Sequence, residues 1–582
     1  MMNDSIVYGF LLPQSSLMRL SFVSVLALCS TVIAEDQAPF LSPPNNAAEK
    51  QHYEFKWPIK NVAVIGSGAG GLQSYRELTR TGFNVRIFER DSVPGGNWRY
   101  TEEPPLAAPV PDASCLVADY VPTIPPKGAQ LPFEKVHLNA AIEELYRQRR
   151  DHRQPKPVWA SLKSNSPAPI FQIPDFPWPQ STPWEVPRQL LERYVKSFAS
   201  LLGVNSNDES IDISYDTRVE LVEKRYVRGV EAGWTLTLRK FTQTGNSSYT
   251  ETWWTEDFDA VVVATGRYNA PHIPSIAGLD EWAAKFPDSV VHSRSYRRPE
   301  DLQNKTVLII GASTSAVEIS IDVNKHAKNV LLSVRPDTDP QPHLRHVVTL
   351  SRVLKNSTVM GEIKRFHPVE ESSGISSGKI ELYNGTIISG VDHIIAATGF
   401  RYAFPFLPQY HNPSLGRDDH TPVGSKAPLI TDCSHIRSLY MDIFYIEEPT
   451  LGFTNMNGGI QVFLWGDYPA FAFAKVWAGQ AKLPSTEDMW KKYHEELRAR
   501  GGYGKNYHFL GWDDMMARIR FFVEWLNEGT GRQINCPSAS LSQIFPIWFK
   551  AHYPIIEDED KSFQPSLGQG SERLDIFEAN DW

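Results

Sequence analysis

The chain has 582 residues, of which 41% are hydrophobic and 21% are charged, as in ordinary soluble globular proteins. This length is sufficient for two or more domains with sizeable cores. A formal net charge of -9 argues against a general nucleic-acid binder, which would carry a basic surface. The four cysteines show no CxxC or Cys/His spacing, so neither a metal site nor a dithiol redox centre is predicted.

The amino terminus has the features of a secretory signal peptide that starts at Met18. Arg19 precedes an apolar run that ends at Cys29, and small residues around Ala34 permit cleavage after that residue. The run is too short to cross a bilayer, and no later stretch is long and apolar enough, so no transmembrane segment is predicted. We therefore expect residues 1–34 to be removed and the mature protein to be secreted or lumenal. A buried helix or an over-extended gene model is the alternative.

A secretory route has two further consequences. Removal of the signal takes Cys29 away and leaves three cysteines, which allow one internal disulfide and one free thiol. We also expect a glycoprotein, with sugar on Asn246, which stands in an Asn-Ser-Ser sequon in a predicted turn. Asn356 and Asn384 stand in sequons too, whereas Asn304 abuts a predicted core strand and is the poorest acceptor.

The first nucleotide-binding pattern begins with a short apolar strand. The glycines Gly66-x-Gly68-x-x-Gly71 follow it, and then come a helix and a second strand. Gly66 permits a tight turn, Gly68 lets a pyrophosphate approach the backbone, and Gly71 lets helix and sheet pack closely. Glu89 ends the second strand, where a carboxylate can accept both ribose hydroxyls of an adenosine. The alternative is a structural glycine turn without a ligand.

A second strand-turn-helix pattern has the sequence Gly311-x-Ser313-x-x-Ala316, with Ser315 in the same turn. Two of the three glycines are replaced, so the match depends on the strand that follows, which ends at Arg335. A carboxylate at that place selects a free 2′-hydroxyl, whereas an arginine suits a 2′-phosphate. The pattern therefore predicts NADPH as the second dinucleotide, against the alternative of a solvated arginine on an ordinary βαβ unit.

The remaining segments predict elements of several kinds. They are a polar linker over residues 35–56, a Pro- and Ala-rich surface excursion over 101–126, a helix over 138–150, a β-hairpin with strands at 234–239 and 249–254, an apolar strand over 260–264 and a helix near 469–481.

Between the two nucleotide patterns lies a segment that identifies a family. Phe286, His292 and Tyr296 match the pattern FxGxxxHxxx followed by Tyr or Phe, which is typical of flavin-containing monooxygenases. Over most of residues 57–485 the chain resembles this family, as a secreted, fungal-type member. Asp288 stands where the family has Gly, which bears on the local turn more than on the class. Baeyer–Villiger enzymes usually end this motif in Trp, so Tyr296 favours the branch that oxidises nitrogen or sulfur. We interpret His292 as a packed structural histidine.

Four other segments resemble the family. One matches its GGxW segment near FAD, two match the ATG signatures where the chain passes between domains, and one matches its TN segment followed by DFP. The last match places Asn165 where the family has an active-site Asn near the reactive flavin carbon; by itself Asn165 would be an unremarkable loop residue. The insertion between Trp98 and Asn165 is longer than usual and is expected to shape the substrate entrance. The cofactor-binding residues that these matches imply are Gly96, Asn97, Trp98, Thr265, Gly266, Thr398 and Gly399.

The resemblance implies an α/β fold with two Rossmann-like dinucleotide-binding domains. The NADPH domain (281–399) would be inserted in the FAD domain (57–280 and 400–582, the second part with a C-terminal extension). NADPH would reduce FAD, the reduced flavin would form a C4a-hydroperoxide with O2, and an amine nitrogen or a sulfur of a small molecule would take the terminal oxygen. The protein would have to exclude water meanwhile, and it would need no metal ion.

Three alternatives stay open at this point. A Baeyer–Villiger ketone monooxygenase shares the fold and differs in its substrates. A pyridine nucleotide–disulfide reductase shares the two-nucleotide plan but requires a redox cysteine pair. A degenerate, non-enzymatic flavoprotein is the third, prompted by Asp288 and by the secretory signal, because NADPH is scarce outside the cytosol. The sequence predicts neither the substrate nor the oligomeric state, and a biosynthetic role is a hypothesis only.

Overall fold

The computed structural model describes residues 51–335, 350, 352–422, 424–504, 507–541, 543, 544 and 548. The expected signal peptide (1–34), most of the expected linker and the last part of the C-terminal extension lie outside these residues. Within the part of the chain that is described, no helix combines the length and hydropathy that crossing a bilayer requires.

The first unit is built on a seven-stranded sheet whose central strands are parallel. Its central strands have continuous apolar sequences such as AVVV and are buried on both faces, as strands of covered parallel sheets are. The strand order is β21 (Leu439–Tyr440), β22 (Phe444–Tyr445), β23 (Leu451–Phe453), β10 (Ala260–Val263), β1 (Asn61–Ile65), β2 (Asn84–Phe88) and β6 (Ile213–Ser214).

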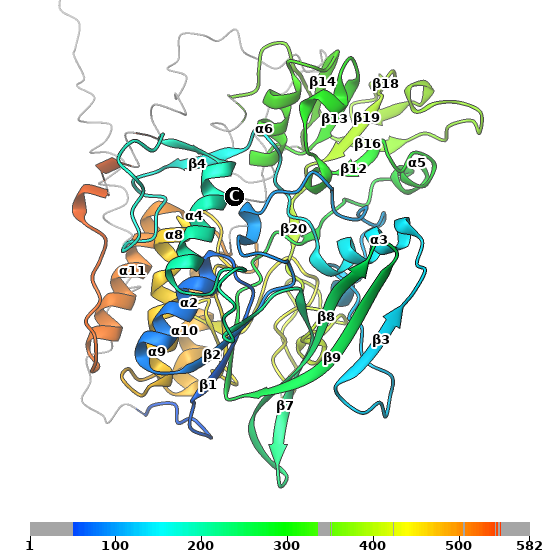
Figure 1. Ribbon diagram of the computed structural model, residues 1–582. Coiled ribbons are helices and arrows are strands. Elements are labelled where there is room, and N and C mark those ends of the chain that lie inside the picture. Colours follow the sequence, from blue (N-terminus) through cyan, green and yellow to red (C-terminus); the bar gives the residue numbers. More distant parts are fainter. Residues whose placement is uncertain are drawn as a thin grey trace, which may run out of the picture. The chain divides into compact units, whose positions relative to one another are not determined.

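Helices from both ends of the chain cover this sheet on one side (Figure 1). The glycine turn after β1 leads into α2, which ends at Gly82 in a left-handed conformation (φ +99°) that favours glycine. Arg76 of α2 is buried and pairs with Asp467 of α9 at 2.6 Å, which joins two helices that are distant in sequence. The helices are α2 (Ala69–Thr81), α4 (Arg188–Leu201), α8 (Val462–Trp465), α9 (Asp467–Trp477), α10 (Thr486–Ala499) and α11 (Gly511–Asn527).

The second unit is built entirely from residues that lie between β10 and β21 in sequence. Its main sheet is parallel, and a small antiparallel sheet lies beside it. The two connections to the first unit pair with each other as β11 (Ala270–Pro271) and β20 (Phe400–Arg401). The fold class predicted from sequence, one dinucleotide-binding unit inserted in another, is thereby confirmed. The elements are β12 (Val290–His292), β19 (His393–Ala396), β13 (Thr306–Ile310), β14 (Asn329–Ser333), β15 (Thr358–Met360), β16 (Ile363–Phe366), β17 (Ile380–Leu382), β18 (Ile387–Ile388), α5 (Leu279–Lys285) and α6 (Thr314–Val323).

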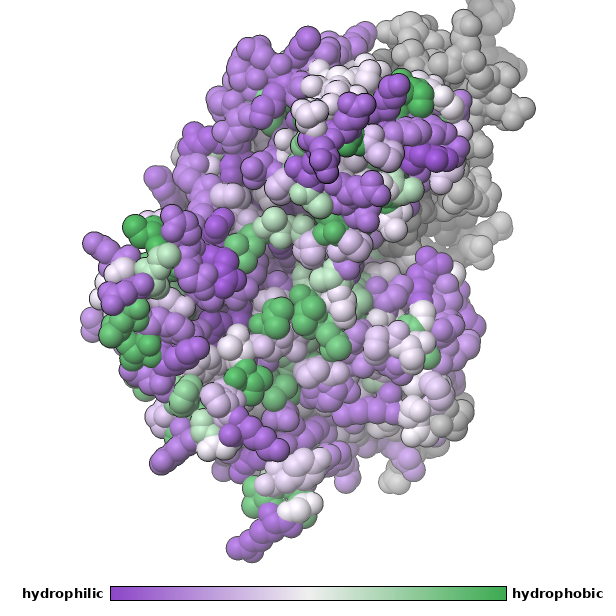
Figure 2. Space-filling view, turned by 90° about the vertical axis from the view of Figure 1, so that its right-hand side faces the viewer, coloured by the Kyte–Doolittle hydropathy of each residue, from purple (hydrophilic) through white to green (hydrophobic). Residues whose placement is uncertain are grey.

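A four-stranded antiparallel sheet extends from the first unit (Figure 1). It contains the predicted hairpin, which is longer than expected, and two edge strands that were not predicted. The strands are β3 (Phe133–His137), β9 (Ser248–Phe258), β8 (Val230–Gly245) and β7 (Thr217–Val227); α3 (Ile142–Arg153) and the short pair β4 (Lys163–Pro167) and β5 (Glu185–Pro187) lie in the same part of the chain. The face seen in Figure 2 is mainly hydrophilic, with small groups of apolar side chains.

The sequence predicted that the Pro- and Ala-rich segment over 101–126 runs along the surface. In the structure part of this segment is buried instead. Tyr120 is buried, and Cys115 forms a disulfide with Cys433, whose Cα lies 5.8 Å away. Asp112 accepts a hydrogen bond from the backbone N–H of Ile273 at 2.8 Å, so the excursion reaches the connection to the second unit. Cys536 is an exposed free thiol, and Cys29 lies outside the described residues.

Candidate active site

A cavity of about 590 Å³ lies where the carboxyl ends of β1 and β13 face each other, the place at which parallel α/β sheets bind ligands. Both glycine turns line it, so the two predicted dinucleotide sites open into one space. Most of the predicted site residues line this cavity: Gly66, Gly68, Glu89, Gly96, Asn97, Trp98, Asn165, Thr265, Gly266, Ser313, Ser315 and Gly399. The others, Gly71, Gly311, Arg335 and Thr398, do not.

The first glycine turn has the geometry of a phosphate cradle. Gly66 adopts φ +105°, and a Cβ on Gly71 would lie 2.0 Å from the carbonyl oxygen of Gly66, so both positions require glycine. Gly68 caps α2 and packs its backbone against Gly96, where a Cβ would lie 2.8 Å from the Gly68 Cα. The N-terminus of α2 therefore meets the cavity without side chains in between, as a bound pyrophosphate needs.

Glu89 is 5% exposed, and neighbouring residues of the first unit hold its carboxylate in place. One carboxylate oxygen accepts hydrogen bonds from the Ser67 N–H at 2.7 Å and the Ser67 hydroxyl at 2.8 Å. The other oxygen accepts from the Asp91 N–H at 2.9 Å. These donors fix the carboxylate on the cavity wall, and its remaining lone pairs fit the hydroxyls of a ribose.

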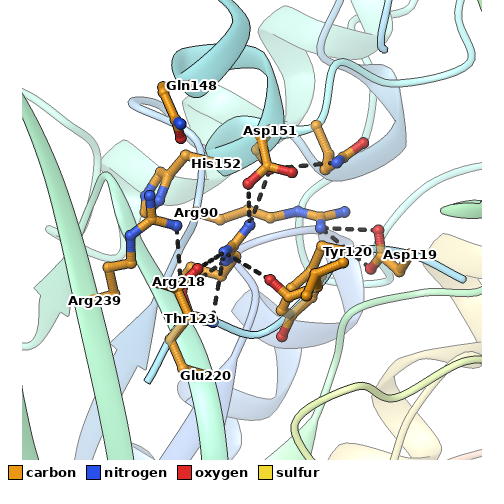
Figure 3. Close-up of polar contacts among 12 residues, drawn as sticks. Arg90, Asp119, Tyr120, Thr123, Gln148, Asp151, His152, Arg218, Glu220 and Arg239 are labelled. Carbon is orange, nitrogen blue, oxygen red and sulfur yellow. Dashed lines mark hydrogen bonds and ion pairs between the residues drawn. The ribbon is translucent and has the colours of Figure 1, made fainter. Parts of the chain in front are cut away.

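A buried ionic network that the sequence did not predict forms the wall near Glu89 (Figure 3). The Arg218 guanidinium lies 4.3 Å from the centre of the Tyr120 ring and donates to Glu220 at 2.8 Å. Beside it, Arg90 pairs with Asp119 at 3.1 Å. Asp119 and Tyr120 come from the long insertion and Arg218 from β7, so only the fold brings them together.

The second glycine turn has the same strand-turn-helix arrangement as the first, with Ser313 in the place of the second glycine. Gly311 adopts φ +124°, and a Cβ there would lie 2.4 Å from the Ala397 carbonyl oxygen. Ser313 is the N-cap of α6, and Ser313 and Ser315 line the cavity at the positive end of that helix. Arg335 is exposed just after β14, away from the cavity lining. Its role in cofactor choice stays a prediction.

The family motif lies in the second unit, where its matching residues make structural contacts. His292 is 1% exposed, and burial lowers its pKa to about 3, so the ring is neutral. Its Nε2–H donates to the Gly399 carbonyl at 2.9 Å, and its Nδ1 accepts from the Arg294 N–H at 3.1 Å. Tyr296 donates to Asp322 of α6 at 2.6 Å. Asp288, in place of the family glycine, is exposed and is not among the residues with positive φ, so the turn does not require glycine.

The two chain crossovers contribute to the site unequally. The carbonyl oxygen of Thr265 accepts a hydrogen bond from the Asn269 side chain at 2.9 Å, and Thr265 and Gly266 line the cavity. At the second crossover Gly399 lines the cavity, whereas the Thr398 hydroxyl donates to the carbonyl oxygen of His272 and faces the connection instead.

Asn165 lies on β4 at a break in the register with β5 and lines the far part of the cavity. The hydroxyl of Ser164 accepts from the Val186 N–H at 2.9 Å and donates to the Ser166 carbonyl at 2.7 Å, which fixes the backbone on both sides of Asn165. Trp98 lies in the same lining and packs edge-on against Phe171.

Three polar atoms on this wall fit a ligand with its own donors and acceptors. The Thr454 hydroxyl, the Asn455 amide oxygen and the Gln461 amide oxygen are buried without a hydrogen-bond partner among the described residues, and all three residues line the cavity. Buried polar groups are normally satisfied, so these atoms indicate an absent polar partner such as the edge of a flavin ring. These residues could not be predicted from spacing, because almost the whole sequence of the unit separates them from the first glycine turn.

Two kinds of site are missing from the described part of the cavity. No group of His, Cys, Asp or Glu in the described residues could hold a metal ion. The described lining contains no cysteine, and the Cys115–Cys433 disulfide lies outside it, so the arrangement of a disulfide reductase, with a redox pair facing a flavin, is not present there.

Comparison with known proteins agrees with this geometry. A family model described as Flavin-binding monooxygenase-like matches residues 134–339, and one described as NAD(P)-binding Rossmann-like domain matches residues 64–124. The chain is 44% identical to "Flavin-containing monooxygenase iboF" of Amanita muscaria (strain Koide BX008), over 90% of this chain and 100% of that protein. It is 29% identical to "Flavin-containing monooxygenase ustF2" of Aspergillus flavus, over 84% of this chain and 96% of that protein.

Two solved structures have a similar fold. One is the S-allyl-L-cysteine S-oxygenase from Allium sativum, with a TM-score of 0.59 at 23% identity, covering 85% of this chain and 94% of that one. The other is Tmm from Pelagibacter sp. strain HTCC7211, with a TM-score of 0.56 at 20% identity, covering 85% and 91%.

Proposed function

Because the chain belongs to the flavin-containing monooxygenase family, and is an NADPH-dependent flavoprotein oxidoreductase that uses FAD, we propose that it transfers one atom of O2 to a nitrogen or sulfur of a small molecule. The observation that carries the proposal is the single cavity lined by both glycine turns, since a hydride donor and a flavin must meet in one space. Tyr296, at the end of the family motif where ketone-oxidising relatives usually have Trp, supports nitrogen or sulfur over carbonyl carbon.

When bound, FAD supplies the oxygen-activating redox chemistry and NADPH supplies the hydride. The N-terminus of α2 and Glu89 would hold the phosphates and the ribose of FAD, and the serine turn before α6 would hold the phosphates of NADPH. Asn165 would donate its amide N–H to the oxygen that is transferred, and its backbone is already fixed by Ser164. The aromatic side chains Phe171, Phe509 and Trp512 line the same space and would exclude water from it.

A substrate panel tests the proposal. The protein, loaded with FAD and supplied with NADPH and air, is offered thioethers, amines and ketones, and products are identified by mass spectrometry. We expect sulfoxides or N-hydroxylated products, each with one additional oxygen atom. Esters formed from ketones alone would assign the chain to the Baeyer–Villiger alternative, and the absence of any oxygenated product would favour the non-enzymatic one.

Arg335 is expected to select NADPH over NADH. A charge-assisted contact to a phosphate contributes about 1.5–3 kcal/mol. Arg335→Ala should therefore weaken the binding of NADPH by roughly one to two orders of magnitude and leave the binding of NADH nearly unchanged. Steady-state KM values for both cofactors measure this. Arg365→Ala, which removes another exposed arginine of the same unit, is the control. Equal weakening of both cofactors by Arg335→Ala would mean that Arg335 supports the fold and does not contact the 2′-phosphate.

We further propose that the protein passes through the secretory pathway and carries sugar. The proposal is supported by the Cys115–Cys433 disulfide, because such bonds persist in oxidising compartments, and by Asn246, which is exposed in the turn between β8 and β9. Expressed in a eukaryotic host, the mature chain should begin near Glu35, and Asn246→Gln should lower its intact mass by one glycan. An unprocessed chain without sugar would contradict this proposal.

A further inference from the structure

Lys156 is a buried cation on the cavity wall and has no part in the proposed oxygen transfer. Its side chain is 7% exposed, and the residue lines the cavity together with Pro157, Val158 and Trp159. Its ammonium donates to the Asn269 amide oxygen at 3.1 Å. Asn269 in turn donates to the carbonyl oxygen of Thr265, so Lys156 is fixed relative to the first chain crossover.

The ammonium has no carboxylate partner among the described residues. Arg90 donates to the same Asn269 oxygen at 2.8 Å and pairs with Asp119 at 3.1 Å. Glu89 is occupied by donors from Ser67 and Asp91. An unpaired buried charge is costly unless a partner arrives, and an ammonium has three donors, of which Lys156 uses one.

The surroundings add more positive charge. Arg297 is 5% exposed, and among the described residues its guanidinium donates to backbone carbonyls only, including that of Lys156 at 3.3 Å. Arg294, 6% exposed, likewise donates to the carbonyls of Asn269 and Leu106. Burial first, and then Arg90, lower the pKa of Lys156 to about 8, although Glu89, Asp119 and Asp91 oppose the change.

We propose that Lys156 binds a phosphate group of a dinucleotide held in the cleft. Lys156 lies near enough to Glu89, the proposed ribose ligand at the end of β2, for the two charges to interact. It directly precedes the segment 157–159, whose Trp159 packs on Tyr296 of the second unit. Phosphate oxygens at this place would accept hydrogen bonds from the two unused N–H groups and supply the missing negative charge. The pyrophosphate of FAD and the phosphates of NADPH are the two sources. The inference depends on the cofactors and not on the nature of the substrate.

The test compares Lys156→Met with Lys163→Met, which removes an equal charge from an exposed lysine seven residues further along the chain. For each holoprotein, the dissociation constant of FAD is obtained from flavin fluorescence on dilution. The dissociation constant of NADPH is obtained from the saturation of anaerobic flavin reduction. We expect Lys156→Met to weaken one of the two by about ten-fold or more, and Lys163→Met to weaken neither. The constant that changes identifies the phosphate. If both constants stay within about two-fold of wild type, the proposal is wrong.

A pH profile separates phosphate binding from packing. A bound phosphate favours the charged ammonium, so the affinity for the identified cofactor should fall as the pH rises above about 8 in the wild type and in Lys163→Met. Lys156→Met should lose this dependence, and Lys156→Arg, which keeps the charge, should retain most of the affinity. If Lys156→Arg weakens binding as much as Lys156→Met does, or if the wild-type affinity is constant from pH 7 to pH 10, Lys156 is a packing residue. The wild-type profile decides even if Lys156→Met fails to fold.

Discussion

Replacement of Gly68 by valine is expected to give a folded but colourless protein that retains no FAD. The space beside the Gly68 Cα toward Gly96 admits a Cβ at 3.4 Å, so the turn itself can form. The two additional methyl groups of valine would stand over the N-terminus of α2, in the path of the pyrophosphate. Loss of even two charge-assisted hydrogen bonds would weaken the binding of FAD by roughly two orders of magnitude or more.

The chain offers a closely matched control for this variant. Gly374 has φ -75° and ψ 166°, nearly the backbone conformation of Gly68 (φ -73°, ψ -178°), and a Cβ there meets nothing within 4 Å. Gly374→Val should therefore be as yellow as the wild type. The ratio of flavin absorbance to protein absorbance after purification measures both, and circular dichroism checks the fold. A Gly68→Val protein with a full complement of FAD would show that the first glycine turn is not the flavin site.

Asn165→Ala is expected to uncouple the reaction while leaving FAD bound and reducible. Reduction of the flavin by NADPH requires two stacked rings and no amide at this position. Transfer of oxygen is different, because charge develops on the transferred atom and is stabilised by donors that do not reorganise. Loss of one such donor costs on the order of 3 kcal/mol, so product formation should fall by about two orders of magnitude. NADPH would still be consumed, and the oxygen would leave as hydrogen peroxide.

The effect is measured as the ratio of product formed to NADPH oxidised, with stopped-flow absorbance for the reduction step. Asn165→Asp should behave no better than Asn165→Ala, because a carboxylate cannot donate and would repel a developing anion. Lys163→Ala, on the same strand but exposed, should remain coupled. If Asn165→Ala instead slows flavin reduction and leaves the ratio unchanged, Asn165 belongs to the nicotinamide site.

The features that could be predicted from sequence are those encoded in short, contiguous patterns. Gly66 and Gly311 require glycine because of their positive φ, and Gly71 because of its close contact with the Gly66 carbonyl; these local requirements are visible in the spacing. The hairpin of β8 and β9 was likewise predicted from alternation and a local turn. The helix expected over 138–150 begins later, at Ile142, because Asn139 has a positive φ and the Ala140 N–H bonds to the Ser247 carbonyl, so the residues before Ile142 are not helical.

The features that could not be predicted depend on contacts between distant segments. Arg218 comes from β7 and Tyr120 from the insertion, and each has an ordinary sequence context. Gln461 lines the cavity from the last part of the chain, almost 400 residues after Gly66. Cys115 and Cys433 are 318 residues apart, and three cysteines do not specify which two pair. Lys156 stands in an insertion that no pattern marks.

Labelling with isotopic oxygen shows directly whether this protein is a monooxygenase. Wild-type holoprotein is supplied with NADPH, ¹⁸O2 and the best thioether or amine of the panel, and both product and water are analysed by mass spectrometry. We predict one ¹⁸O atom in each product molecule and one NADPH oxidised per product, with Asn165→Ala consuming NADPH without labelled product. Product oxygen derived from water, or NADPH consumption by the wild type that yields only hydrogen peroxide with every nucleophile, would contradict it.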